Sequence, residues 1–225
     1  MTAPGRNGGS THLALARHGE TVWHADNRYA GGRSGIDLTD LGREQAEELR
    51  RWAVGQSFDA VVVSPVRRAV ETASPTAAAL DLELEVVDDL REVDFGIAEG
   101  RTIDELSSMD ADMVQRFRSD PVRHPFPGAE PPEDAAVRAG AALREVARRH
   151  AGEDVLVVAH NTLLRLALCS LLDLPVSRYR QLFPRLDNVA LTRVAVPADP
   201  SAPAGLLALN VPPHDPGTTR MKEPR

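Results

Sequence analysis

Two histidines and a pair of arginines follow apolar runs of the chain, in positions that favour an anion-binding site. His18 stands between Arg17 and a glycine directly after the run HLALA, and His160 directly follows the run DVLVVA. A third run, DAVVV, is soon followed by Arg67 and Arg68. Because the carboxyl ends of parallel strands collect ligands, we expect these side chains to meet at one sheet edge. Arginines bind phosphate-like groups, imidazole can act as a nucleophile, and a helix N-terminus would add further donors.

Each of these features alone has a simpler explanation. A single histidine at a strand end is usually a structural residue that makes hydrogen bonds, and adjacent arginines usually lie on the surface. The occurrence of all three features in order is what favours a site. The remaining histidines carry no motif, and we do not expect catalysis from His12, His124, His150 or His214.

The apolar pattern predicts the elements that position these residues. Apolar runs predict strands at 12–16, 59–64, 82–87 and 154–160, with later strands at 188–196 and 205–211. Helical periodicity predicts helices at 38–53, 66–80, 132–150 and 162–172. Thr39 is the expected cap of the first helix, and Pro75 should kink or divide the second.

This alternation of strands and helices predicts an α/β fold, namely a single three-layer α/β/α domain with a mostly parallel central sheet. The domain is expected to cover residues 12–211. Residues 1–11 are expected to form a flexible N-terminal arm, and residues 212–225 a flexible C-terminal tail.

Composition excludes several classes of protein. The 26 Lys+Arg residues against 33 Asp+Glu give a net charge of −7, which gives no support to nucleic-acid binding. Neither a signal peptide nor a membrane-spanning stretch is recognisable, and the single cysteine, Cys169, allows no internal disulfide, so we expect a cytoplasmic protein without a membrane partner. The only lysine is Lys222, and no Gly-Lys-Ser/Thr sequence occurs, which excludes a phosphate-loop NTPase.

Four segments place the candidate residues in longer motifs. They are RHGETVWHADNRYAGGRSGIDLTDLGREQA at 17–46, SPVRRAVETA at 64–73, LREVDFGIAEG at 90–100 and VVAHNTLLR at 157–165. In this order and spacing they resemble the histidine phosphatase superfamily, whose fold is phosphoglycerate-mutase-like. The resemblance extends from about residue 13 to about residue 194, and the pair Glu99-Gly100 resembles the phosphatase branch of the family.

The resemblance implies roles for five core residues. His18 would be the nucleophile that forms a phosphohistidine, a role that suits a neutral imidazole without a metal. Arg17, Arg68 and His160 would surround the transferring phosphoryl group. Glu92 would protonate the leaving alcohol and then activate water. We therefore expect a metal-independent phosphomonoesterase of the histidine acid phosphatase type, without a cofactor, that acts on a small phosphorylated metabolite.

Contacts with the rest of the substrate are where the chain departs from the family pattern. The resemblance implies substrate contacts from Thr21, His24 and Asn161 in addition to the core residues. His24 stands where the family commonly has Asn, Asn161 stands where it has Gly, and the usual Gln is missing from segment 27–31. A surface position is an equally open reading for His24. Residues 101–133 are expected to cover the pocket mouth.

Other functions stay open. A phosphoglycerate-type phosphomutase is less favoured, because the mutase branch has a lysine shortly after its acidic segment and the only lysine here is Lys222. A non-catalytic phospholigand-binding relative is disfavoured by the intact core. A metallohydrolase using His18, His160 and Glu92 would lack the closely spaced ligand pair of a typical zinc site. A homodimer is the default expectation for an enzyme of this size.

Overall fold

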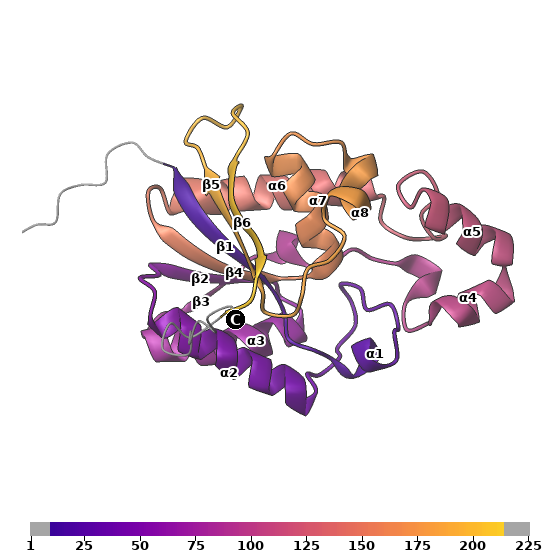
Figure 1. Ribbon diagram of the computed structural model, residues 1–225, viewed down its shortest axis with the longest axis horizontal. Helices are drawn as coiled ribbons and strands as arrows, with labels where there is room; N and C mark the ends of the chain where they lie inside the picture. Colours follow the sequence, from indigo (N-terminus) through magenta and orange to yellow (C-terminus); the bar gives the residue numbers. More distant parts are fainter. Residues whose placement is uncertain (1–9, 214–225) are drawn as a thin grey trace, which may run out of the picture.

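Six strands form one sheet in the order β3-β2-β4-β1-β5-β6 within residues 10–213, which are the residues that the computed structural model describes (Figure 1). The strands are β1 Thr11–Arg17, β2 Ala60–Val63, β3 Leu84–Val86, β4 Asp154–Ala159, β5 Leu191–Val196 and β6 Gly205–Val211. The first four strands are mutually parallel, whereas β5 and β6 run antiparallel to their neighbours. The predicted α/β fold with a mostly parallel sheet is therefore confirmed.

Strand register brings the candidate residues together. In the pairing of β1 with β4, Arg17 lies opposite Ala159, so His18 and His160 leave the sheet side by side. On the other side of β4, Val63 of β2 lies opposite Val158, which places Ser64 next to His160. Three strands thus end at the same edge, as the sequence predicted.

Helices cover both faces of the sheet (Figure 1). The pair α2 (Asp40–Val54) and α3 (Arg67–Leu80) packs on one face, and the pair α6 (Pro132–Arg149) and α7 (Asn161–Leu171) packs on the other. Leu13 contributes to the core under α6 and α7, whereas its neighbour Ala14 contributes to the core under α2 and α3. Because alternate residues face opposite layers, a strand buried on both faces is apolar throughout, which is the pattern that the sequence shows.

The predicted strands and long helices all occur. Helix α3 continues through Pro75, so of the two effects expected from this residue, a kink or a division of the helix, the division is wrong. Thr72 and Ala73 before the proline and Thr76 and Ala77 after it are all buried, so both halves of the helix stay packed against the sheet. Packing on both sides of the proline therefore outweighs the hydrogen bond that it removes.

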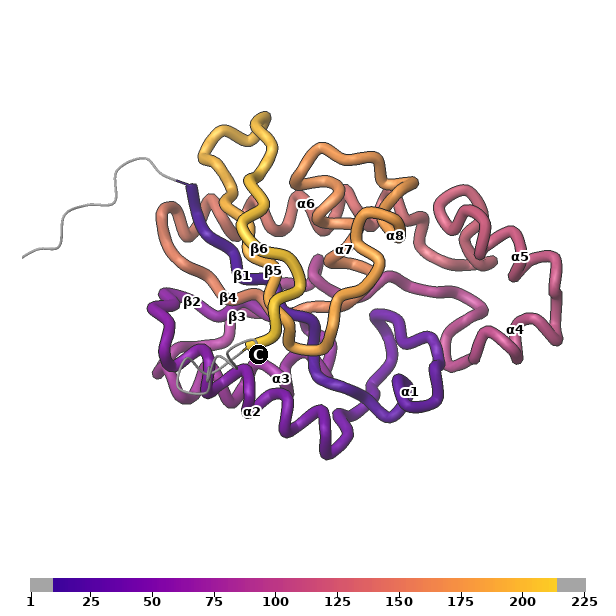
Figure 2. The backbone as a smooth tube through the Cα atoms, viewed as in Figure 1, coloured from indigo at the N-terminus to yellow at the C-terminus, as the bar shows by residue number. Residues whose placement is uncertain are grey.

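Several short elements were not predicted. They are the helices α1 Val22–Ala25, α4 Ile103–Met109, α5 Ala111–Ser119 and α8 Tyr179–Leu182, and the 3₁₀ turns η1 Asp88–Leu90, η2 Gly96–Ala98 and η3 Val176–Arg178. Figures 1 and 2 show α4 and α5 projecting beyond the end of the sheet. This pair has a small core of its own, which includes Leu106, Met113, Phe117 and Phe126.

The predicted N-terminal arm and C-terminal tail lie mostly outside the residues that the structure describes. Of the expected arm 1–11, residues 1–9 lie outside the described residues, while Thr11 is buried and begins β1. Of the expected tail 212–225, residues 214–225 lie outside them. Between residues 10 and 213, none of the helices has the length and apolar character that crossing a bilayer requires.

The loop after β1 is fastened to the first turn of α2. Thr39 caps this helix as predicted, accepting a hydrogen bond from the Gly42 amide at 3.0 Å, and its own hydroxyl donates to Glu20 Oε1 at 2.8 Å. The two backbones touch, because a Cβ on Gly42 would lie 2.1 Å from the Glu20 carbonyl oxygen and one on Gly19 2.5 Å from the Gly42 carbonyl oxygen. Only glycine allows this approach, which fixes the position of His18.

We expect Gly42→Ala to destabilise the protein despite the higher helix propensity of alanine. The propensity gain is about 1 kcal/mol at most, whereas forcing a methyl group into packed backbone costs about 1–3 kcal/mol. Gly55→Ala at the other end of α2 is the control, because its nearest new contact would be 3.4 Å away. Urea unfolding of both variants checks this, and a Gly42→Ala variant at least as stable as wild type would contradict it.

Candidate active site

A cavity of about 440 Å³ opens beyond the ends of β1 and β4. Its inner wall contains Arg17, His18, His24, Glu92 and Asn161. The other lining residues come from the loop after α1 (Asn27, Arg28, Tyr29 and Ala30), from the residue before η2 (Phe95), from α4 and α5 (Ile103, Phe117 and Arg118), from α7 (Thr162) and from α8 (Arg180). The segment expected at the pocket mouth, 101–133, contributes three of these residues.

The ring of His18 is held in one tautomer. Nδ1 lies 2.7 Å from the carbonyl oxygen of Gly19, which can only accept, so Nδ1 carries the proton. Nε2 is then an acceptor, and it receives a hydrogen bond from Arg68 Nε at 3.1 Å. Burial, followed by the charges of Arg68 and other neighbours, holds the pKa of His18 well below its usual range. His18 is therefore a neutral imidazole whose lone pair faces the Arg68 guanidinium.

Arg68 is fully buried and its guanidinium makes hydrogen bonds throughout. Besides His18, it donates to the carbonyls of Ala30 and Gly31 at 3.1 and 3.2 Å and to the Ser34 hydroxyl at 3.2 Å. These bonds fix the loop that follows α1 above the cavity. They also explain why lysine could not replace this residue, since a single ammonium cannot reach four separate acceptors in a fixed plane.

Arg67, the neighbour of Arg68, lies outside the site. Its exposed side chain pairs with Asp37 at 3.0 Å and with Glu71 at 2.8 Å. Adjacent residues of a helix face different directions, so α3 turns only one of the two arginines toward the sheet. The structure thus brings Arg68 to His18 and leaves Arg67 on the surface.

His24 lies in the site, which the sequence alone left open. Its ring stacks on that of His18 with centroids 5.3 Å apart, and its Nε2 accepts from Arg17 Nη2 at 2.7 Å. On the other side of the ring, Nδ1 of His24 lies 3.2 Å from the hydroxyl of Thr21 and 3.3 Å from its amide nitrogen. Burial and the charge of Arg17 lower the pKa of His24 to about 3. Thr21 is fully buried and is not among the residues that line the cavity, and its expected substrate contact stays a prediction.

His160 and Asn161 lie beside His18 with unused polar atoms. The His160 ring meets the His18 ring edge-on with centroids 5.1 Å apart, and its Nε2 is 2.7 Å from the Ser64 hydroxyl. Within residues 10–213, His160 Nδ1, Asn161 Oδ1 and Arg17 Nε are buried without a hydrogen-bond partner. Buried polar atoms are normally paired, so three unpaired ones near one imidazole indicate a place for a polar ligand.

Glu92 closes the site at the N-terminus of α7. Its carboxylate accepts from the backbone amides of Val93, Leu163 and Thr162 at 3.0, 2.8 and 3.1 Å. Burial raises the pKa of Glu92, and this effect outweighs the backbone hydrogen bonds and the charge of Arg68, which lower it. Glu92 is thus a carboxyl group that can hold a proton above the usual range for glutamate, in the same cavity as His18.

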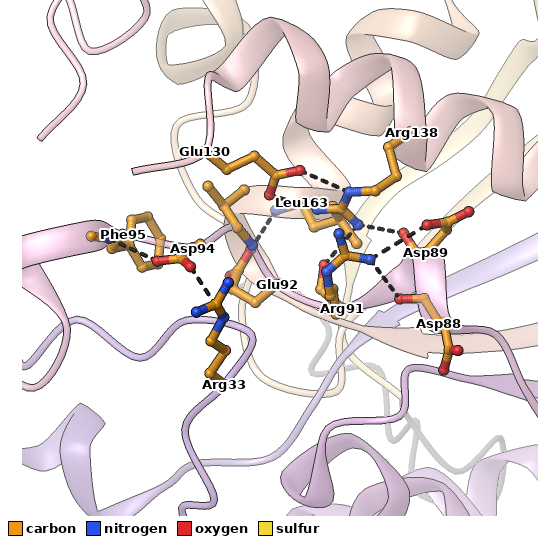
Figure 3. A network of polar contacts seen from close by, with 12 residues as sticks. Arg33, Asp88, Asp89, Arg91, Glu92, Asp94, Phe95, Glu130, Arg138 and Leu163 are labelled. Atoms are coloured by element: carbon orange, nitrogen blue, oxygen red, sulfur yellow. Dashed lines mark hydrogen bonds and ion pairs between the residues drawn. The ribbon is translucent and has the colours of Figure 1, made fainter. Parts of the chain in front are cut away.

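A clamp from α6 holds the segment that carries Glu92 (Figure 3). Arg138 makes a bidentate pair with Glu130, with both contacts at 2.8 Å, and its Nη1 also donates to the carbonyls of Asp89 and Arg91 at 2.6 and 3.1 Å. The amide of Glu130 donates to the Asp94 carbonyl at 2.8 Å. The backbone on both sides of Glu92 is therefore fixed.

Sequence reasoning missed this clamp and several further residues. Asn188, which follows η3 and α8 in the chain, donates to the His18 carbonyl at 2.7 Å, and Ser64 orients His160. Arg118 and Arg180 line the outer cavity. Ser64 directly follows a predicted strand, which was a signal for it, whereas nothing in the local sequence distinguishes Asn188 or the two arginines. No three His, Cys, Asp or Glu side chains among residues 10–213 form a group that could hold a metal ion.

Comparison with known proteins now identifies the family. Residues 13–202 match the histidine phosphatase superfamily (branch 1). The chain belongs to this superfamily. It is 30% identical over 167 residues to phosphoserine phosphatase 1 of Hydrogenobacter thermophilus, covering 74% of this chain and 79% of that protein. It is 31% identical over 191 residues to a Yersinia pestis protein named probable phosphoglycerate mutase GpmB, covering 85% and 87%.

Solved structures of the superfamily have the same fold. Bacillus stearothermophilus YhfR superposes with a TM-score of 0.82 at 28% identity, covering 90% of this chain and 98% of that one. The α-ribazole phosphatase of Shigella flexneri superposes with a TM-score of 0.77 at 27% identity, covering 88% and 96%. The similarity therefore includes nearly the whole of each neighbour, with its sheet and both helical layers.

The histidines should differ sharply when they are titrated. At pH 6 we expect His18, His24 and His160 to be neutral, since burial and nearby arginines lower all three pKa values. His150 should be protonated at that pH, because hydrogen bonds to Glu85 and Glu153 outweigh burial and raise its pKa. Nitrogen-15 NMR of the imidazole rings measures this directly. A His18 ring that takes up a proton near pH 6.5 would contradict the assignment of a neutral ring.

Proposed function

We propose that this protein is a metal-independent phosphomonoesterase that hydrolyses a small phosphorylated metabolite through a phosphohistidine on His18. The observation that carries the proposal is the neutral His18 ring, with its Nε2 lone pair facing Arg68 and Glu92 in the same cavity. Relatives named as phosphatases support it. The imidazole is neutral because of burial and nearby charge, so it does not need a metal to free its lone pair.

In the first step, Nε2 of His18 attacks the phosphorus atom in line with the ester oxygen. The N–P bond forms as the P–O bond to the alcohol breaks, and Glu92 gives its proton to the departing oxygen. Arg17, Arg68 and His160 neutralise the charge on the phosphoryl oxygens, and losing one such donor typically costs about 3 kcal/mol of transition-state stabilisation. If the Ser64 hydroxyl donates its hydrogen bond to Nε2 of His160, Nδ1 of this ring carries the proton and can donate to a phosphoryl oxygen.

In the second step, water attacks the phosphorus atom of the phosphohistidine. Glu92, now a carboxylate, takes a proton from the water as the N–P bond breaks, which releases inorganic phosphate and restores both residues. The raised pKa of Glu92 suits both roles, because a group used as acid and then as base works best when its pKa approaches the operating pH. Such a group is worth about 10²–10⁴-fold in rate.

A phosphoglycerate-type phosphomutase is the second candidate, favoured by the similarity to the relative named as a mutase. A mutase would return the phosphoryl group from His18 to a second hydroxyl of the substrate rather than to water. Incubation with 3-phosphoglycerate separates the two, since hydrolysis releases phosphate whereas a mutase yields 2-phosphoglycerate without net release. Isomerisation as the main outcome would replace the phosphatase proposal.

The nucleophile is tested by His18→Ala with p-nitrophenyl phosphate as substrate. We expect kcat to fall by at least about 10⁴-fold, because no other group can form the covalent intermediate. His124→Ala, which alters an exposed histidine outside the cavity, is the control and should retain full activity. Rapid quenching of the wild type should trap acid-labile phosphate on His18, detected by mass spectrometry. Turnover that persists in His18→Ala would exclude the mechanism.

The pH profile should report on Glu92. On an alkyl phosphate, kcat should fall as the pH rises through the raised pKa of Glu92, because the acid form is lost. No loss from protonation of His18 is expected on the acidic side until the pH is well below 6.5. This combination would give the enzyme an acid phosphatase character.

Glu92→Gln should remove the fall of kcat at alkaline pH, and it should separate the role of Glu92 as acid in the first step from its role as base in the second. With p-nitrophenyl phosphate, whose leaving group needs no proton, this variant should release one equivalent of p-nitrophenol in a burst. Slow turnover should follow, because dephosphorylation lacks its base. Stopped-flow absorbance measures the burst, and an unchanged steady rate without a burst would assign the proton transfers to another group.

A further inference from the structure

Two arginines at the outer end of the cavity have no role in phosphoryl transfer. Arg118 of α5 and Arg180 of α8 come from segments far apart in the chain, yet both line the same cavity as His18. Neither has an acidic partner within ion-pairing distance among residues 10–213. A third lining arginine, Arg28, is different, because it pairs with Glu105 at 2.9 Å.

The position of Arg180 is fixed by aromatic contacts. Its guanidinium lies 4.6 Å from the ring centre of Phe117, and its Nε donates to the hydroxyl of Tyr179 at 3.1 Å. Arg118 directly follows Phe117 on α5. Both arginines lie close enough to Tyr29 to oppose, with their charges, the rise that burial causes in the pKa of its hydroxyl. The two charges therefore converge on the Tyr29 end of the cavity.

The cavity carries an excess of positive charge. Arg17 lines it beside His18, and Glu92 is the only carboxyl among the lining residues. The exposed Arg118 and the half-buried Arg180 add two positive charges that no carboxylate of the described cavity wall pairs with. Like charges held close together repel one another, so an anion bound at this end of the cavity would be stabilised. A volume of about 440 Å³ is in the range of pockets that enclose whole metabolites, so one ligand can reach both ends.

We propose that Arg118 and Arg180 form a second anion subsite, so that the preferred substrate is a phosphomonoester with a further anionic group distant from the ester that is cleaved. A carboxylate or a second phosphoryl group would both fit guanidinium donors. The aromatic side chains of Tyr29 and Phe117 form the wall beside the subsite. The statement about the substrate rests on the proposed phosphatase function, whereas the anion subsite itself can be tested by binding alone.

The test compares matched ligands on the His18→Ala variant, which cannot be phosphorylated. Calorimetry would measure the affinity of 3-phosphoglycerate and of glycerol 3-phosphate, which differ only in carboxylate against hydroxymethyl. A second pair, propane-1,3-diol bisphosphate and its monophosphate, tests a second phosphoryl group. In at least one pair, we expect the ligand with the second anionic group to bind about tenfold or more tightly at low ionic strength. A tenfold ratio is the affinity difference that one charge-assisted hydrogen bond usually makes. The pair with the larger ratio identifies the chemistry of the second anion.

Arg180→Gln and Arg118→Gln, each combined with His18→Ala, should lower that affinity ratio toward one while leaving the binding of the two ligands without a second anionic group unaffected. Arg180→Lys retains the charge and should restore part of the ratio, which a purely structural role for Arg180 would not predict. Arg116→Gln is the matched control, because Arg116 is an exposed arginine of the same helix outside the cavity. The kcat/KM values of the same single variants with His18 intact should show the same pattern.

Three results would overturn the subsite. They are equal binding of both members of both pairs, an equal loss in the glutamine variants for ligands with and without the second anionic group, and an equal effect of Arg116→Gln. Failure of the proposed function would look different, because wild-type protein would then release no phosphate from any ester, including p-nitrophenyl phosphate. The calorimetric ratios would still decide whether the second anion is bound.

Discussion

The whole site depends on keeping one imidazole neutral among positive charges. His18 is surrounded by Arg17, Arg68 and two further histidines, and an exposed imidazole without these neighbours would titrate near neutral pH. Burial makes the charged form of His18 costly. The Nε–H of Arg68 donates a hydrogen bond to Nε2 of His18, so this nitrogen acts as an acceptor and carries no proton. The positive charges around His18 therefore keep its ring neutral. In the proposed function the same charges would stabilise the oxygens of a phosphoryl group.

This arrangement needs rigid support, and the fold provides it at three levels. The register of β1 with β4 sets His18 beside His160, and the contact of Gly19 with Gly42 fixes the loop against α2. The buried guanidinium of Arg68 joins α3 to the loop after α1. Glu92 is supported separately, since the clamp of Arg138 and Glu130 fixes its segment to α6 (Figure 3).

The outer cavity is built differently from the inner one. The nucleophile and its charged neighbours lie on the sheet edge and at the ends of long helices. The outer wall comes from α4, α5 and α8, short elements with a small separate core that project beyond the sheet (Figure 2). Relatives of similar fold are named for different phosphorylated substrates.

The sequence by itself determined the sheet, the two helical layers and the edge at which His18, Arg68 and His160 meet, because buried strands and amphipathic helices are local patterns that packing preserves. The local pattern did not separate Arg67 from Arg68, since that depends on which side of α3 faces the sheet, and the choice came from the longer motif shared with the family. Tertiary structure alone decided the outer cavity. The convergence of Arg118 with Arg180 joins segments that no local pattern relates. Pairings of this kind depend on how distant loops fold over one another, which short-range periodicity does not encode.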